Sequence, residues 1–160
     1  MNTVEKEFLA IVSQYQPMLY KIVRLYRDSV EDREDLFQEI VFQLWKSYPN
    51  FRGEAQIKTW MYRIALNTAL ASFRKNSAKI NYLSQLPDLA EEIISDEQVL
   101  REEQLFAVLN LLEDGEKALI ALYFDELSYQ QMAEILGINE NYVGVKLNRI
   151  KTKIKNLLKK

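Results

Sequence analysis

The residues best suited to chemistry lie near the C-terminus, on one side of an amphipathic segment that covers residues 140–158. At about 100° per residue, this side presents Asn141, Tyr142, Val145, Asn148 and Arg149. In a DNA major groove Arg can bond guanine, Asn can bond adenine and Val can contact a thymine methyl group. The flanking lysines, Lys146 and Lys153 among them, are suited to phosphates. The pattern therefore favours DNA reading over the alternative, an amphipathic helix with a solvated lysine face.

The chain just before this segment has the spacing of a helix-turn-helix. Ser128 can cap a short helix that ends at Gly137, where a left-handed residue would stop it. Ala133 is small at the point where the second helix must approach closely. Gly144 is unusual, because Gly inside a helix costs about 1 kcal/mol relative to Ala. A close approach of the backbone to DNA would account for it.

The segment 32–48 carries a candidate protein interface. Its apolar residues cover one broad face and are Leu36, Phe37, Ile40, Val41, Leu44, Trp45 and Tyr48. The opposite face holds Asp35, Gln38, Glu39, Gln43 and Lys46, with Phe42 in their midst. A large aromatic side chain on a polar, acidic face marks a protein interface, unless the first helix or the linker covers it.

Residues 51–67 combine a loop with a polar helical stripe. Gly53 permits a sharp loop before the helix. On the helix Trp60 faces the core, whereas Thr59, Arg63 and Asn67 belong to a polar, partly basic stripe. A loop beside such a stripe can hold single-stranded DNA, with a base in a pocket and phosphates along the stripe. A core tryptophan with solvated arginines is the alternative explanation.

The elements that must position these residues are all helical. Periodicity of 3.6 residues without clean alternation predicts an all-α fold for the 160-residue chain. The expected helices cover residues 4–15, 17–27, 32–48, 56–75, 96–112, 113–123, 128–136 and 140–158. Residues 76–95 mix Asn, Ser, Pro and acids and have a weak apolar pattern. We therefore expect two small helical domains, residues 1–76 and 96–160, joined by an acidic linker, residues 77–95.

Charge is segregated along the chain, although the net charge is only -2. Residues 76–117 contain ten acids and three bases, whereas residues 138–160 contain seven bases and one acid. This distribution suggests that different segments meet different partners. Simple solvation of helix faces would produce it as well.

Composition excludes several classes of function. The chain has no Cys and no His, which excludes disulfides, the usual zinc sites and nucleophilic catalysis by Ser-His-Asp or Cys-His groups. It also lacks a Gly-rich phosphate loop. We therefore expect no enzymatic activity, no cofactor and no metal. No apolar run reaches the length of a membrane span and residues 1–7 are too polar for a signal peptide, so we expect a cytoplasmic protein without membrane insertion.

Two stretches resemble bacterial sigma factors. Residues 35–39, Asp-Leu-Phe-Gln-Glu, and residues 59–67, Thr-Trp-Met-Tyr-Arg-Ile-Ala-Leu-Asn, look like sigma region 2. Residues 112–158 look like region 4, including Ser-Tyr-Gln-Gln-Met-Ala-Glu-Ile-Leu-Gly at 128–137. Two such regions with a short acidic linker and little else resemble the extracytoplasmic-function (ECF) subgroup.

The resemblance implies partners and roles for named residues. The partners would be core RNA polymerase, through its β′ clamp helices and β flap, promoter DNA and an anti-sigma factor. The face docked on the clamp helices would consist of Asp35, Leu36, Phe37, Gln38, Glu39 and Phe42. The site for minus-ten DNA would consist of Phe51, Arg52, Gly53, Glu54, Ala55, Lys58, Thr59, Trp60, Arg63 and Asn67. The minus-thirty-five element would be read by Asn141, Tyr142, Val145, Lys146, Asn148, Arg149 and Lys153.

Two other readings of the residues stay open. A stand-alone helix-turn-helix regulator would bind duplex DNA tightly by itself, but it leaves the pattern of residues 59–67 unexplained. A helical adaptor that binds only protein leaves the basic C-terminal segment unexplained. For the sigma factor, we predict that the free protein binds duplex DNA poorly, because each small domain offers a limited contact area.

Overall fold

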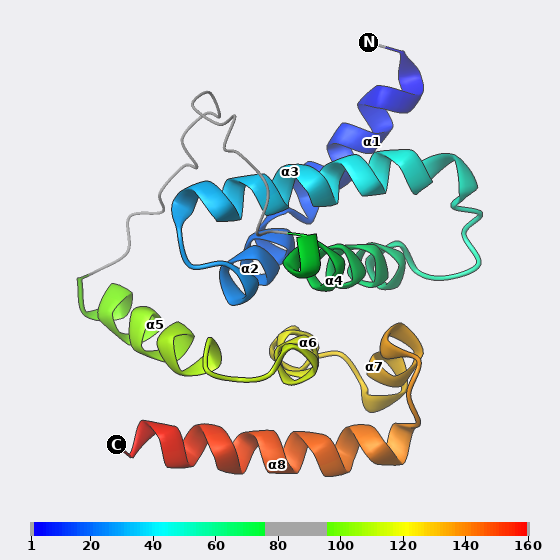
Figure 1. Cartoon of the computed structure of the whole chain (residues 1–160). Coiled ribbons are helices and arrows are strands. Elements are labelled where there is room, and N and C mark those ends of the chain that lie inside the picture. The colour runs from blue at the N-terminus through cyan, green and yellow to red at the C-terminus, as the bar shows by residue number, and fades with distance from the viewer. Residues whose placement is uncertain (1, 76–95, 160) are drawn as a thin grey trace.

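The computed structural model describes the backbone of residues 2–75 and 96–159 (Figure 1). All regular secondary structure in these residues is helical. In these ranges there are eight α-helices and no strand, which confirms the all-α prediction. The helices are α1 (Thr3–Gln14), α2 (Gln16–Tyr26), α3 (Val30–Ser47), α4 (Ile57–Lys75), α5 (Asp96–Leu109), α6 (Asp114–Phe124), α7 (Tyr129–Leu136) and α8 (Glu140–Leu158). A 3-10 turn, η1 (Tyr48–Asn50), follows α3.

The helix boundaries follow local hydrogen bonding. Side-chain oxygens of Asn2, Ser29 and Asn139 accept hydrogen bonds from backbone N–H groups at the starts of α1, α3 and α8. The largest difference from the predicted boundaries is the end of α5, which we expected at residue 112. There the amide of Leu112 bonds the carbonyl of Leu109 at 3.1 Å, so the chain tightens into a turn before α6 begins.

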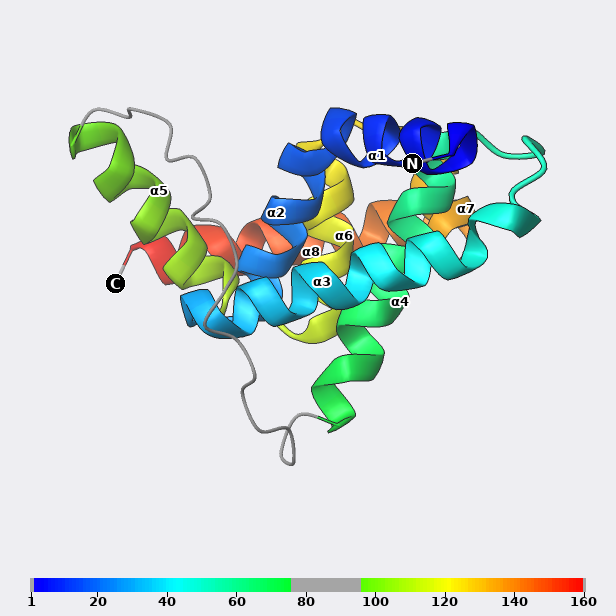
Figure 2. The same cartoon turned by 90° about the horizontal axis from the view of Figure 1, so that it is seen from above.

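The N-terminal half is built around α3. Figures 1 and 2 show α3 lying across α2 and α4, and the three helices contact one another in every pairing. Their fully buried side chains are Leu19, Ile22, Ile40, Leu44, Met61 and Leu66. The helix α1 packs against this group through Phe8 and Val12. The apolar faces predicted from periodicity therefore form one helical core.

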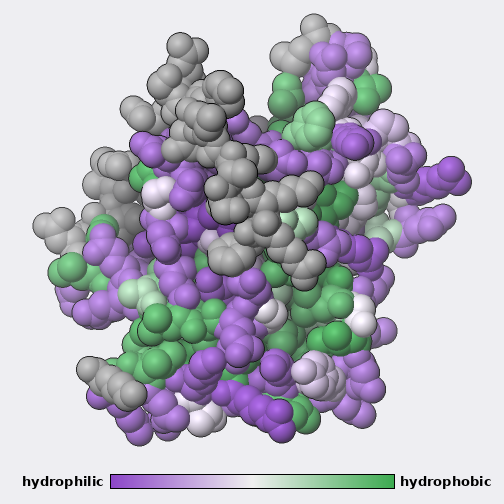
Figure 3. Space-filling view, viewed as in Figure 1, coloured by the Kyte–Doolittle hydropathy of each residue, from purple (hydrophilic) through white to green (hydrophobic). Residues whose placement is uncertain are grey.

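The C-terminal half is built around α8. In Figure 1 this helix runs along the edge of the molecule, and it contacts α5, α6 and α7. The fully buried side chains here are Leu109, Ile120, Leu122, Met132, Leu147 and Ile150. The Figure 3 surface is hydrophilic along much of the edge that α8 forms, with hydrophobic side chains above it. This half therefore presents one long helix to the outside.

The two halves pack directly on each other. The helix α2 contacts α5 and α6, and α4 contacts α7. The hydroxyl of Tyr26 on α2 donates a hydrogen bond of 2.8 Å to the backbone carbonyl oxygen of Asp114 on α6. The predicted linker, residues 77–95, lies outside the described residues. Among the residues described, no helix is both long and apolar enough to cross a membrane.

Candidate nucleic-acid and protein interfaces

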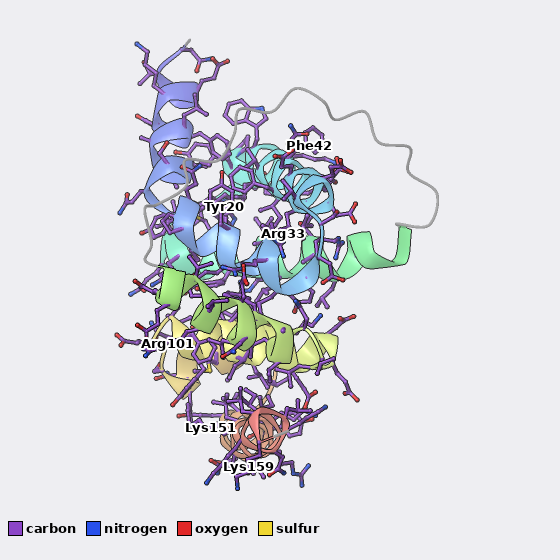
Figure 4. All side chains as sticks on the ribbon, turned by 90° about the vertical axis from the view of Figure 1, so that its left-hand side faces the viewer. Tyr20, Arg33, Phe42, Arg101, Lys151 and Lys159 are labelled. Atoms are coloured by element: carbon purple, nitrogen blue, oxygen red, sulfur yellow. The ribbon has the colours of Figure 1, made fainter. Side chains whose placement is uncertain are left out.

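One face of α8 is open to solvent. Tyr142 and Val145 are 48% and 50% exposed, and the exposed set also includes Asn141, Asn148 and Arg149. On the opposite face Val143, Leu147 and Ile150 are buried. Figure 4 views α8 nearly end-on and shows Lys159 at the edge of the molecule farthest from Phe42. The residues predicted to read DNA bases thus share one accessible helix face.

The turn between α7 and α8 has the geometry expected from its sequence. Ser128 and Gln131 bond each other's backbone amides reciprocally at the start of α7. Gly137 ends the helix with a left-handed φ of 68°. Gly144 does not lie open toward a ligand, because a Cβ added there would be 3.3 Å from Cε2 of Tyr129. Gly144 thus faces the Tyr129 ring of α7 rather than open space.

Lys153 is engaged by an acid on another helix. Its Nζ lies 2.9 Å from Oε1 of Glu116, which also accepts the backbone amide of Glu113 at 2.9 Å. Burial alone would raise the pKa of Glu116, but these two donors outweigh it and hold the pKa below its usual value. The hydrogen bond to Glu116 in turn raises the pKa of Lys153. Glu116 thus uses one of the three N–H donors of Lys153, whose side chain is 40% exposed.

The loop before α4 is anchored at one end and open at its tip. The ring of Phe51 packs on Trp60 with 4.9 Å between centroids, and Trp60 also contacts Tyr48. Arg52, Gly53 and Glu54 are exposed, Ala55 is half-buried, and Gly53 has a left-handed φ of 73°. The loop is thus a short exposed arch held by aromatic packing.

The polar stripe of α4 is only partly accessible. Arg63 and Asn67 are exposed as predicted, but Thr59 is only 7% exposed, so it belongs to the core and not to the surface stripe. Lys58 forms an ion pair of 2.7 Å with Oδ2 of Asp125, at the end of α6. Arg63 donates a hydrogen bond of 3.1 Å to the backbone carbonyl oxygen of Glu134 on α7. The C-terminal half therefore engages Arg63 of the stripe and the neighbouring Lys58.

A hydrophobic groove of about 550 Å³ separates α1 from α3. It is lined by Glu5, Phe8, Leu9, Phe37, Gln38, Val41, Phe42 and Trp45. Phe42 is 56% exposed, so neither α1 nor another described element covers it. Trp45, which belongs to the predicted broad apolar face, is 39% exposed, and its ring packs against that of Phe8 with 5.0 Å between centroids. Leu36 is only 3% exposed, so it supports this face from below and cannot itself contact a partner.

Comparison with known protein families explains why these surfaces occur together. Residues 11–79 match the sequence model for sigma-70 region 2, and residues 102–154 match that for sigma-70 region 4. The chain belongs to the sigma-70 family. These regions define RNA polymerase sigma factors, which are initiation factors without catalytic activity and which act with core polymerase on promoter DNA. The matches therefore support neither a stand-alone regulator nor a protein-only adaptor.

Relatives place this sigma factor in the ECF group. It is 30% identical to the RNA polymerase sigma factor YlaC of Bacillus subtilis, over 91% of this chain and 88% of the relative. It is 29% identical to the ECF RNA polymerase sigma-E factor of Haemophilus influenzae, over 95% of this chain and 87% of the relative.

Two solved structures share the fold of this sigma factor, each with a TM-score of 0.72. One is CnrH in complex with the cytosolic domain of CnrY, at 18% identity, covering 97% of this chain and 89% of that one. The other is the sigma factor RpoE in complex with the anti-sigma factor NepR from Bartonella quintana, at 21% identity, covering 96% and 98%.

Sequence reasoning missed two contributors to these surfaces. Phe8 and Leu9 form the second wall of the groove, but the α1 sequence by itself only indicates an amphipathic helix. Asp125 meets α4 from a position 63 residues away from Tyr62 in the chain. No local pattern marks such a pairing, because Asp125 and the adjacent Glu126 follow the same apolar helix and the sequence does not tell which of them meets α4.

Proposed function

We propose that this ECF sigma factor docks on the polymerase clamp helices through the outer face of α3. The observation that carries this proposal is the exposed Phe42, which lines an apolar groove beside Gln38 on a helix with acids in its first turn. An exposed aromatic side chain beside hydrogen-bonding groups has the composition of an interface hot spot. Asp35, Phe37 and Glu39, each partly buried, would form the rest of this face.

For promoter DNA, we propose two separate sites on one chain. The loop from Phe51 to Ala55 would hold an unpaired base of the minus-ten element, and Lys58, Arg63 and Asn67 would follow the phosphates. Trp60 would support the loop through its packing on Phe51. The exposed face of α8 would read the minus-thirty-five element, with Lys146 at its flank. Region 4 would also contact the β flap.

The separation of the two proposed DNA sites suggests where the domains begin and end and where in the cell the protein acts. We propose a region 2 domain of residues 1–76 and a region 4 domain of residues 96–160, connected by residues 77–95. We also propose that the protein acts in the cytoplasm, where RNA polymerase works. The similar chains CnrH and RpoE were solved with CnrY and NepR, which supports an anti-sigma partner here as well.

Run-off transcription with purified core polymerase on genomic promoter fragments tests this proposal. We expect start sites that depend on the added protein. In Gln38→Ala and Phe42→Ala variants, the concentration needed for half-maximal transcription should rise about tenfold or more, since hot-spot side chains contribute most of an interface's free energy. Ser13→Ala, an exposed α1 change outside the groove, is the control and should leave transcription unchanged.

Two results would count against the proposal in different ways. Full activity of the Gln38→Ala, Phe42→Ala double variant would show that the polymerase does not dock on this face of α3. It would leave the proposed sigma function itself intact. Absence of any protein-dependent start site, combined with tight binding to a duplex operator without polymerase, would contradict the promoter function itself.

A further inference from the structure

A continuous series of five aromatic rings leads from the groove on α3 to the loop before α4. The ring centroids of Trp45 and Phe8 lie 5.0 Å apart, and those of Phe8 and Tyr48 lie 5.4 Å apart. The series continues with 6.2 Å from Tyr48 to Trp60 and 4.9 Å from Trp60 to Phe51. All four pairs are tilted, at spacings that aromatic pairs favour. The rings therefore connect α1 and α3 to the loop by direct packing.

Tyr48, the middle ring of the series, is linked to the loop in two ways. It lies in η1, directly after α3, and its backbone carbonyl oxygen accepts a hydrogen bond of 3.0 Å from the amide of Phe51. Its ring contacts Trp60, on which the Phe51 ring packs in turn. The direction in which Phe51 leaves α3 and the place where its ring rests on α4 therefore both depend on Tyr48.

The loop beyond Phe51 has few restraints of its own. Arg52 and Glu54 are exposed, and neither side chain has a hydrogen bond or ion pair in the part of the chain that the structure describes. Gly53 between them has open space around its Cα. Binding costs less free energy when a loop is already held in its bound form, because less conformational freedom is lost. The rings under Phe51 supply the restraint that the tip of the loop lacks.

We propose that Tyr48 is a positioning residue of the minus-ten site: its ring holds Trp60 and Phe51 in the orientation in which the loop captures an unpaired base. This inference rests on the proposed function of the loop. The ring carries the role, because the Tyr48 hydroxyl makes no hydrogen bond within the described residues. Phe8, which is only 4% exposed, supports Tyr48 from the side of α1. The first helix therefore contributes to the minus-ten site without touching DNA.

Base capture can be measured with the holoenzyme, which is core polymerase together with this chain. The probe is a fluorescein-labelled single-stranded oligonucleotide that carries the non-template minus-ten element of a promoter whose start site depends on this protein. In a series of further oligonucleotides, an abasic site replaces one base at a time. At the captured position the parent protein should lose affinity about tenfold when the base is removed, because stacking and pocket contacts of that base are lost. The ratio of the two affinities is the measured quantity.

Tyr48→Leu keeps an apolar side chain and removes the ring. Its ratio should fall from about tenfold to about twofold, because the loss of such ring contacts changes an equilibrium by a factor of about five. Tyr48→Phe keeps the ring and should restore the parent ratio. Tyr48→Met fills the same space with a flexible side chain and should give a smaller loss, which keeps the test valid if Tyr48→Leu folds poorly. A smaller folded fraction weakens binding to both oligonucleotides equally, so the ratio does not report stability.

Tyr20→Leu is the matched control, because it makes the same replacement at another half-buried tyrosine of the N-terminal half. The Tyr20 ring stacks on Phe37 at 4.6 Å and is not part of the series, so its ratio should equal that of the parent. A parent ratio near tenfold that Tyr48→Leu leaves unchanged, or that Tyr20→Leu reduces equally, would overturn the positioning role and leave the minus-ten site standing. A parent ratio near one at every position would contradict base capture by the loop, and the positioning role with it.

Discussion

At the scale of single residues, Gly144 on α8 and Tyr129 on α7 show how closely the two helices of the helix-turn-helix pack. Gly144 lies in the first two turns of α8, where the sequence penalty for glycine is about 1 kcal/mol. A Cβ added at Gly144 would lie 3.3 Å from Cε2 of Tyr129, slightly closer than an ordinary van der Waals contact. A methyl group at this position would therefore require the Tyr129 ring to shift by a few tenths of an ångström.

The contact at Gly144 leads to a stability prediction. Because the Tyr129 ring is 39% exposed, it can move by the few tenths of an ångström that a methyl group requires. We therefore expect Gly144→Ala to raise the free energy of unfolding, by up to about 1 kcal/mol. Urea unfolding followed by circular dichroism measures this. A loss of stability in Gly144→Ala that Tyr129→Ala relieves would mean that the ring cannot move.

At the scale of elements, the helix boundaries depend on short-range chemistry. The end of α7 requires a left-handed residue, and Gly137 provides it with a φ of 68°. We expect Gly137→Ala to lower the free energy of unfolding by about 1 kcal/mol, because a Cβ strains that conformation even though the space around it is open.

Gly115 offers a matched control for the α7 boundary. It also has open space around its Cα, but it lies in the first turn of α6 and has no left-handed φ. Gly115→Ala should therefore stabilise the protein slightly or leave it unchanged. Destabilisation by Gly137→Ala but not by Gly115→Ala in urea unfolding supports the role of φ. Equal destabilisation by both would contradict it.

At the scale of the whole molecule, two buried tyrosines connect the halves. Burial raises the pKa of Tyr26 and of Tyr62, and the neighbouring acids Asp114 and Asp125 raise these pKa values further. Each hydroxyl donates across the interface, to the Asp114 carbonyl and to the Asp125 carboxylate. A tyrosine whose pKa is higher in the folded state stabilises that state at neutral pH, and the stabilisation is lost as pH rises above the unfolded value of about 10.

The raised pKa values of Tyr26 and Tyr62 predict that the folded protein loses stability at alkaline pH. The free energy of unfolding should fall steadily above pH of about 10. Tyr26→Phe and Tyr62→Phe should each cost about 1 kcal/mol at neutral pH and should each remove part of that alkaline decline. Urea unfolding across a pH series measures both effects, with Tyr142→Phe on the exposed face of α8 as control. If the free energy of unfolding falls as steeply above pH of about 10 in both variants as in the parent, these hydroxyls do not cause the loss of stability.

The sequence by itself determined the helices, their faces and the two family patterns. Periodicity assigns Val143, Leu147 and Ile150 to the inside of α8 because neighbours on a helix face are only three or four residues apart. Caps such as Ser128 act on amides within three residues. Phe42 was suspected as an interface residue for the same local reason, because its own helix face is polar.

Only the tertiary structure decided which of these surfaces are free. It buried Thr59, paired Lys153 with Glu116, added Phe8 and Leu9 to the α3 groove and set Asp125 against α4. These outcomes depend on side chains that are dozens of residues apart in the chain, such as Tyr62 and Asp125. Whether such groups meet is determined by how whole helices pack, because helical periodicity orders neighbours within one helix and carries no information about the partner helix.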